Sequence, residues 1–127
     1  MRVAVIGHVE WCEFVRVERV PLAGEIVNGS SYVEEPAGGG AVAAVQMARL
    51  AGRCDFFTAL GDDPVARRSI DRLGALGVTV HAAKRYKPTR RAWVYVDGQG
   101  ERTITVIGEK HVPGLGDPLS WLSLIHI

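Results

Sequence analysis

Apolar runs alternate with amphipathic segments along this chain, and the alternation predicts parallel strands separated by helices. Three short runs have the apolar, partly β-branched composition of buried strands, at residues 3–6, 54–60 and 78–82. The first ends at Gly7 and is predicted to be a buried central strand. Because strands that alternate with helices favour a parallel sheet, the pattern indicates the α/β class.

Two helices are predicted between these strands. The first runs from about residue 40 to residue 51 and stops at Gly52. Its apolar face is expected to comprise Ala41, Val42, Val45 and Ala48. The second begins at Asp63, a good N-cap residue, with Pro64 at the first helical position. Its buried positions are expected to be Ala66, Ile70, Leu73 and Leu76.

Two other segments change to the period of a β-hairpin and are predicted to lie outside the parallel sheet. Residues 14–33 alternate apolar and polar positions on either side of a turn. Residues 92–107 form a second hairpin around Asp97-Gly98-Gln99-Gly100, a strong turn signal. In this hairpin one face carries Trp93 and Tyr95, and the other Val94 and Val96.

A glycine run precedes the first helix and is the most suggestive local feature. Gly38, Gly39 and Gly40 lead directly into the helix, whose first backbone N–H groups have no partner within it. Glycines allow an anionic or hydroxyl-rich ligand to approach such groups closely. The run lacks the Gly-Lys-Ser/Thr ending of a phosphate-binding P-loop. A flexible joint is the alternative interpretation.

Polar and aromatic residues follow the first strand, at residues 7–13. Ligands of open α/β sheets bind beyond the carboxyl ends of the strands. Glu10, Cys12 and Glu13 are therefore candidate ligand-binding residues, with a plain connecting loop as the alternative. The segment lacks the Gly-x-Gly-x-x-Gly turn of dinucleotide enzymes.

Composition and charge narrow the classes of partner. The chain has 127 residues, of which 47% are hydrophobic and 23% charged, which suits one globular domain or part of a larger one. A net charge of +1 indicates no nucleic-acid or membrane partner. Five positive charges within residues 84–91 favour a solvated approach to the next strand over a binding patch. Cys12 and Cys54 match no zinc or disulfide spacing, so we expect a reduced, cytoplasmic protein.

The last residues differ in character from the rest of the chain. Residues 119–127 are apolar, have no polar finish and look like translated sequencing adapter. We therefore expect residues 1–118 to be one N-terminal part of a larger domain and 119–127 to be a foreign or truncated tail.

The order and spacing of several short motifs resemble one family. These are Gly7, the turn at 23–25, the glycine-rich helix start through Leu50, residues 60–63 and residues 97–104. Over residues 2 to about 108 the chain resembles the N-terminal part of the PfkB (phosphofructokinase-B), or ribokinase-like, carbohydrate kinases. The resemblance implies the N-terminal portion of a ribokinase-like three-layer α/β/α sandwich, with the hairpins at about 14–33 and 92–107 as a lid.

The resemblance also implies an activity. Such a kinase transfers a phosphoryl group from ATP, with Mg²⁺, to a hydroxymethyl group of a sugar or nucleoside, and a homodimer through the lid strands is a further expectation. The family's catalytic aspartate, in a Gly-Ala-Gly-Asp motif, has no counterpart in this chain. We therefore assign no catalytic residue and expect this chain, as written, to be inactive. A non-catalytic small-molecule sensor on the same shell is the alternative.

The resemblance also implies which residues bind the substrate, because the family's substrate-binding positions align with positions of this chain. An asparagine and an aspartate that hold sugar hydroxyls in the family align with Glu10 and Cys12, and Glu13 is expected to compensate for the weakly bonding thiol. The family signature Gly-Gly-Asn-x-x-Asn falls on residues 37–42. Gly38 and Gly39 still allow a substrate to approach the start of the helix closely, whereas Val42 replaces the substrate-binding asparagine. These departures indicate a more apolar acceptor than ribose or fructose phosphate, or lost activity.

Overall fold

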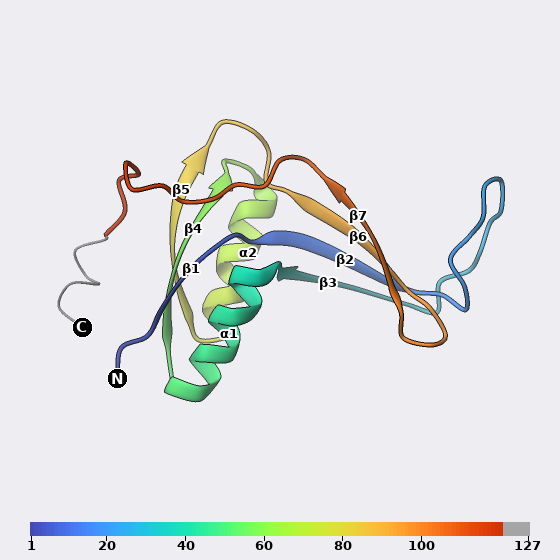
Figure 1. Ribbon diagram of the computed structural model, residues 1–127, viewed down its shortest axis with the longest axis horizontal. Helices are drawn as coiled ribbons and strands as arrows, with labels where there is room; N and C mark the ends of the chain where they lie inside the picture. The colour runs from blue at the N-terminus through green and yellow to red at the C-terminus, as the bar shows by residue number, and fades with distance from the viewer. Residues whose placement is uncertain (121–127) are drawn as a thin grey trace.

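The computed structural model describes residues 1–120 as two sheets and two helices. In chain order the elements are β1 (Ala4–Ile6), β2 (Glu10–Arg16), β3 (Ser31–Ala37), α1 (Gly39–Ala51), β4 (Cys54–Gly61), α2 (Pro64–Ala75), β5 (Val78–Arg85), β6 (Arg91–Val96) and β7 (Arg102–Ile107). A parallel sheet has the order β1-β4-β5, and a second sheet has the order β3-β2-β6-β7 (Figure 1). The predicted α/β class is confirmed.

Both helices pack on one face of the parallel sheet. Small residues of α1, such as Ala44, let its backbone lie close to Phe56 and Leu60 of β4, and Leu73 of α2 joins the same core cluster. The predicted helices are confirmed within one or two residues. Gly52 ends α1 with a φ of 88°, a conformation that favours glycine.

Three details of the predicted packing are wrong. In the described chain β1 is an outer strand of the parallel sheet, and Ile6 is 58% exposed, because β4 takes the central position between β1 and β5. Val42 is also 58% exposed and faces away from the core. In α2, Ser69 is buried where Ile70 was expected, and Ile70 is exposed. Ser69 can be buried because its hydroxyl donates a hydrogen bond to the carbonyl of Val65 at 2.9 Å.

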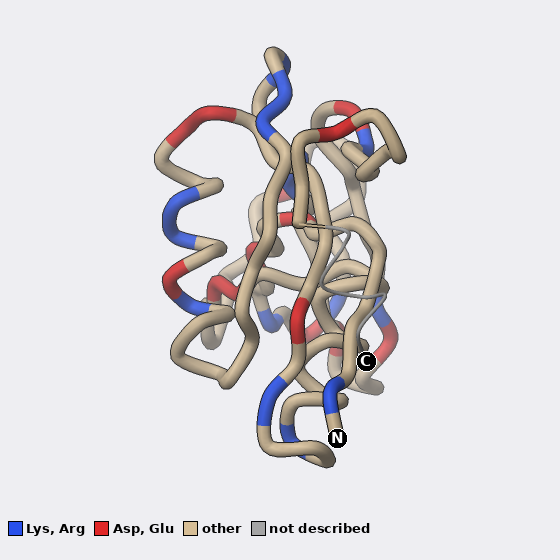
Figure 2. The backbone as a smooth tube through the Cα atoms, turned by 90° about the vertical axis from the view of Figure 1, so that its left-hand side faces the viewer, with Lys and Arg blue, Asp and Glu red and all other residues tan. Residues whose placement is uncertain are grey.

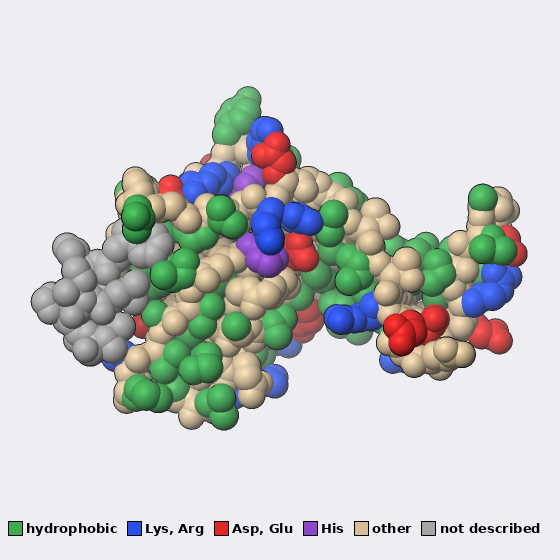
Figure 3. Space-filling view, in the orientation of Figure 1, with side chains coloured by type: hydrophobic (Ala, Val, Ile, Leu, Met, Phe, Trp, Pro, Cys, Tyr) green, Lys and Arg blue, Asp and Glu red, His purple; other side chains and the backbone are tan. Residues whose placement is uncertain are grey.

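The two predicted hairpins join into one four-stranded sheet, which we call the lid sheet. β2 pairs antiparallel with β3 and parallel with β6, and β6 pairs antiparallel with β7. The first strand starts earlier than expected, so residues 10–13 belong to a strand and not to a connecting loop. Figure 3 shows the lid sheet projecting from the body of the molecule as a separate arm.

Ion pairs attach the lid sheet to α2. Arg72 bonds both carboxylate oxygens of Glu35 at 2.8–3.0 Å, and Arg68 bonds Glu34 at 2.9 Å. Arg68 also lies over the ring of Trp11, 4.4 Å from its centroid. Figure 2 shows basic and acidic positions recurring along this helix. The outer strand β3 is therefore held to the helical layer at two points.

The segment after β7 returns toward the parallel sheet (Figure 1). Arg85 holds it by bonding both carboxylate oxygens of Asp117, at 2.7 and 2.8 Å, and the carbonyl of Val112. The expected foreign tail, 119–127, lies mostly outside the described residues. None of the described helices is long and apolar enough to cross a membrane.

Candidate functional site

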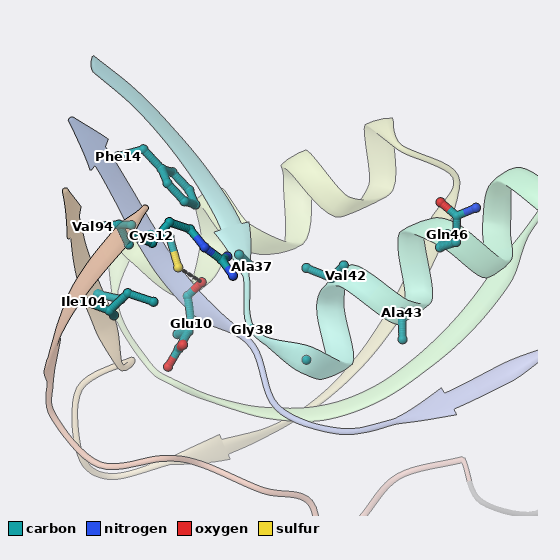
Figure 4. Close-up of a pocket in the computed structure, with 13 residues that line it drawn as sticks. Glu10, Cys12, Phe14, Ala37, Gly38, Val42, Ala43, Gln46, Val94 and Ile104 are labelled. Atoms are coloured by element: carbon teal, nitrogen blue, oxygen red, sulfur yellow. Dashed lines mark hydrogen bonds between the residues drawn. The ribbon is translucent and has the colours of Figure 1, made fainter. Parts of the chain in front are cut away.

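A cavity of about 620 Å³ lies between one face of the lid sheet and the start of α1. We call it the lid cavity. Its lining residues are Glu10, Cys12, Phe14, Ala37, Gly38, Gly39, Val42, Ala43, Gln46, Ala92, Val94, Arg102 and Ile104. Figure 4 shows Val42 pointing from the first turn of α1 toward the strands that carry Cys12 and Ile104. Five of the six residues predicted from the sequence line this cavity together.

Glu13 is the predicted residue that the structure separates from the others. Successive side chains of a strand point to opposite faces, so Glu10 and Cys12 of β2 face the cavity while Glu13 faces away. Glu13 is 8% exposed, bonds Arg91 at 2.8 Å through both carboxylate oxygens, and accepts the Tyr32 hydroxyl at 3.0 Å. It therefore does not compensate for Cys12 inside the cavity, contrary to expectation.

Glu10 is the only carboxylate among the cavity-lining residues. Its Oε2 lies 2.9 Å from Arg90 Nε, but that N–H forms no hydrogen bond, so the contact is an ion pair alone. The carboxylate consequently keeps acceptor capacity for a hydroxyl group in the cavity.

Cys12 is a buried thiol and not a nucleophile. It is 4% exposed, and its Sγ lies 3.7 Å from the carbonyl oxygen of Glu10, within the range of a weak hydrogen bond. Burial, and next the nearby charge of Glu10, raise the pKa of the Cys12 thiol to about 11. The side chain therefore contributes apolar surface at neutral pH.

We predict that Cys12 resists alkylation in the folded chain. A pKa of about 11 in place of 9.0 lowers the thiolate fraction at pH 8 about 100-fold, and burial slows access further. Mass spectrometry after iodoacetamide treatment, with and without urea, measures this directly. Modification of Cys12 at the same rate in both conditions would contradict the buried position.

The glycines form a close-packed junction and not a loose joint. Gly38 is the N-cap of α1 with a φ of 85° and offers no side-chain bond to the helix. A Cβ on Gly40 would lie 2.6 Å from the carbonyl oxygen of His8, and one on Gly7 would lie 2.8 Å from Gly40 Cα. Only glycine fits this crossing, which brings the start of α1 against the β1–β2 connection.

The basic segment 84–91 is mostly engaged in ion pairs. Arg90 and Arg91 pair with Glu10 and Glu13 of the lid sheet, and Lys87 pairs with Glu109. These charges therefore tie the segment to its neighbours.

The sequence did not identify the cavity residues of β6 and β7. Ala92, Val94, Arg102 and Ile104 enter the site because β6 pairs with β2 and β7 with β6. The alternation in the second hairpin predicted that Val94 and Trp93 lie on opposite faces. It did not predict which of the two faces lies on the cavity side of the lid sheet. The described residues contain no group of three or more His, Cys, Asp or Glu side chains that could hold a metal ion.

Comparisons with known proteins agree on this architecture. The curated ribokinase of Dictyostelium discoideum is 28% identical over 108 residues, which cover 84% of this chain and 34% of that protein. The solved ribokinase of Thermotoga maritima is 27% identical with a TM-score of 0.71, over 84% of this chain and 36% of that one. The Arabidopsis thaliana ribokinase, solved with ribose and ATP, is 26% identical with a TM-score of 0.65, over 84% and 35%.

The fold thus matches the N-terminal part of the ribokinase fold, as predicted from the motifs. The family model "pfkB family carbohydrate kinase" matches residues 1–114, so the chain belongs to the pfkB family of carbohydrate kinases. The chain spans about a third of the length of the relatives that it matches.

Proposed function

We propose that this chain is the lid and acceptor-binding part of a kinase that phosphorylates a hydroxymethyl group of a sugar or nucleoside. The observation that carries the proposal is the lid cavity, where five predicted substrate-binding residues meet in a chain of this family. A lid over the acceptor excludes water, which otherwise competes as a phosphoryl acceptor.

The lining of the cavity suggests how an acceptor binds. Gly38 and Gly39 leave space at the start of α1, where backbone N–H groups can donate to hydroxyl oxygens. Glu10 accepts hydrogen bonds from hydroxyl groups at the same end. The remaining walls are largely apolar, with Cys12 and Val42 where the family has polar residues, which favours an acceptor with some apolar surface.

ATP and Mg²⁺ are the proposed co-substrate and metal ion. Support for the nucleotide comes from the relatives, one of which was solved with ribose and ATP. We assign no described residue to ATP, and residues 1–120 contain no cluster of three or more His, Cys, Asp or Glu side chains to which Mg²⁺ could be assigned.

The test of the activity starts from sequencing the locus beyond codon 118 and uses the protein that this reading frame encodes. We expect the frame to continue into a glycine-rich helix start with an aspartate, the base that takes the acceptor proton. With ATP and Mg²⁺, that protein should release ADP only when a suitable sugar or nucleoside is added. A continuous frame without such an aspartate would contradict the kinase.

The second candidate is a non-catalytic sensor that binds a small molecule in the same cavity. The observation that favours it is the loss of polar groups at Ala37, Cys12 and Val42, all of which line the cavity. Sugar binding without ADP release by the protein encoded at the sequenced locus would support the sensor, and acceptor-dependent ADP release would eliminate it.

We predict that Val42→Asn improves binding of hydroxyl compounds. Val42 is exposed in the cavity, so an asparagine fits and adds one hydrogen bond. We expect two- to tenfold tighter ribose binding by calorimetry, from roughly 0.5–1.5 kcal/mol for that bond. Leu50→Asn, on an exposed part of the same helix outside the cavity, is the control. Equal effects of both variants would disprove a specific contact.

We also propose a homodimer through the lid strands. β7 is an outer strand of the lid sheet, and its exposed residues include Val106 and Ile107. Sedimentation equilibrium should give a mass twice that of one chain. The substitution Val106→Lys should weaken the dimer and lower the average mass toward that of the monomer. A monomer at all concentrations would contradict the dimer.

A further inference from the structure

Helix α2 contacts strand β3 of the lid sheet from both faces of the strand. Glu34 and Glu35 are neighbours on β3, so their side chains point to opposite faces of the lid sheet. Glu35 is opposite Cys12 of β2 and shares its cavity face, which leaves Glu34 on the outer face. Arg72 bonds Glu35, and Arg68, one turn earlier on α2, bonds Glu34. We call these two ion pairs the α2 clamp.

The contacts of the α2 clamp are directional. Nε and Nη2 of Arg72 both bond the Glu35 carboxylate, at 2.8–3.0 Å, and this paired arrangement fixes the plane of the guanidinium group. Arg68 donates to Glu34 at 2.9 Å and lies 4.4 Å from the ring centroid of Trp11. The Trp11 indole N–H donates to the same carboxylate at 3.2 Å, and Trp11 is buried, so Arg68 packs against a fixed ring. Both arginines therefore favour one position of β3.

Apolar packing does not by itself fix the angle of the lid sheet. The main core cluster includes Val9, just before β2, whereas the lid sheet has a separate cluster around Cys12, Ala92 and Val94. The lid sheet projects from the body as an arm (Figure 3), and its strand β7 is exposed along its whole length. The α2 clamp thus joins two separately packed parts of the molecule.

The side chains of the α2 clamp remain in contact with water. The two arginine side chains are 47–53% exposed, and the two glutamate side chains are 27–33% exposed. Exposed ion pairs contribute little to the free energy of unfolding and are screened by salt. They can nevertheless select one orientation of an arm, because releasing the arm opens neither of the two apolar clusters.

We propose that Arg68 and Arg72 are positioning residues that hold the lid sheet over the lid cavity before an acceptor arrives. The cavity is then formed in advance, and the acceptor loses no affinity to the ordering of the lid. The inference rests on the proposed function only in naming an acceptor as the occupant, since the α2 clamp acts on the lid sheet itself.

Residual dipolar couplings of backbone amides in the ¹⁵N-labelled chain test the α2 clamp. They compare the orientation of the lid sheet with that of the parallel sheet in the same molecule. At low salt we expect one alignment to fit both sheets. In Arg68→Gln/Arg72→Gln the couplings of the lid sheet alone should shrink, since each lost pair changes the ratio of held to released lid about two- to fivefold. High salt should change the unsubstituted chain in the same direction.

Charge reversal separates the α2 clamp from a general effect of substitution. Arg72→Glu alone should shrink the lid couplings, and Arg72→Glu combined with Glu35→Arg should restore the shared alignment. Arg67→Gln is the control, because Arg67 is exposed on the same helix and forms no ion pair within residues 1–120. Unchanged lid couplings in Arg68→Gln/Arg72→Gln, or equal changes in Arg67→Gln, would overturn the α2 clamp.

Calorimetric titration with ribose and with adenosine relates the α2 clamp to binding. The compound that binds should bind Arg68→Gln/Arg72→Gln about two- to fivefold more weakly, because fewer chains hold the lid in place. Equal affinity of this variant and the unsubstituted chain would overturn the positioning role. Absence of binding by either compound would contradict the proposed function, whereas the couplings alone decide whether the α2 clamp holds the lid.

Discussion

Replacing Gly40 with alanine is expected to destabilise the chain by roughly 3 kcal/mol, the upper part of the range for overpacking. The new Cβ would lie 2.6 Å from the carbonyl oxygen of His8 and 2.8 Å from its nitrogen. These are backbone atoms and cannot rotate away, so α1 must move relative to the β1–β2 connection. Urea denaturation followed by circular dichroism measures the loss in the free energy of unfolding.

The neighbouring glycine provides a matched control. A Cβ on Gly39 would lie 3.7 Å from the nearest imidazole carbon of His8, an ordinary contact, and alanine is a better helix former than glycine. Gly39→Ala should therefore leave stability unchanged or slightly raised. Equal stability of Gly39→Ala and Gly40→Ala would contradict the close crossing at Gly40.

Asp63→Ala is the second substitution with a large expected effect, also about 3 kcal/mol. The Asp63 carboxylate caps α2 by accepting the Ala66 N–H at 2.8 Å. It also accepts the Thr89 N–H at 2.7 Å and the Thr89 hydroxyl at 2.8 Å, which joins α2 to the β5–β6 connection. Loss of the cap costs about 1 kcal/mol, and the buried Thr89 N–H left without a partner costs about 2 kcal/mol more. Asp62→Ala, at an exposed neighbouring carboxylate, should change stability little.

This contribution should depend on pH. Burial alone would raise the pKa of Asp63, but hydrogen bonds from Thr89 and Ala66 outweigh it and hold the pKa below its usual 3.8. A lowered folded-state pKa stabilises the fold above the unfolded value, and this stabilisation disappears as pH falls through the folded value. The difference in stability between the unsubstituted chain and Asp63→Ala should be constant above pH 5 and shrink below about 3.8. A difference that is constant down to pH 2 would contradict the charged cap.

The helices and the parallel sheet could be predicted because their signals are local. Asp63 and Pro64 begin α2 where the capping rules place its start, and Gly52 ends α1. The prediction that Ile70 is buried was wrong, because a serine whose hydroxyl bonds its own helix, here Ser69, can take the buried position.

The lid sheet could not be predicted as one unit because it depends on distant pairing. β2 and β6 meet through residues such as Cys12 and Ala92, which are far apart in the sequence and linked by no local motif. Glu13 was misplaced for a related reason. The strand begins at Glu10, so alternation turns Glu13 to the opposite face, whereas a loop allows any direction. Gly38, Gly39 and Val42, which the glycine motif singled out, all line the cavity.

A nuclear magnetic resonance titration of the ¹⁵N-labelled chain tests whether the lid cavity is the acceptor site. Neutral and phosphorylated sugars and nucleosides are added in turn while backbone amide shifts are followed. If an acceptor binds there, we expect saturable shifts concentrated at Cys12, Gly38, Gly39 and Val42, and smaller ones at Asp63 and Thr89. No saturable shift with any compound, or shifts concentrated away from the cavity, would contradict it.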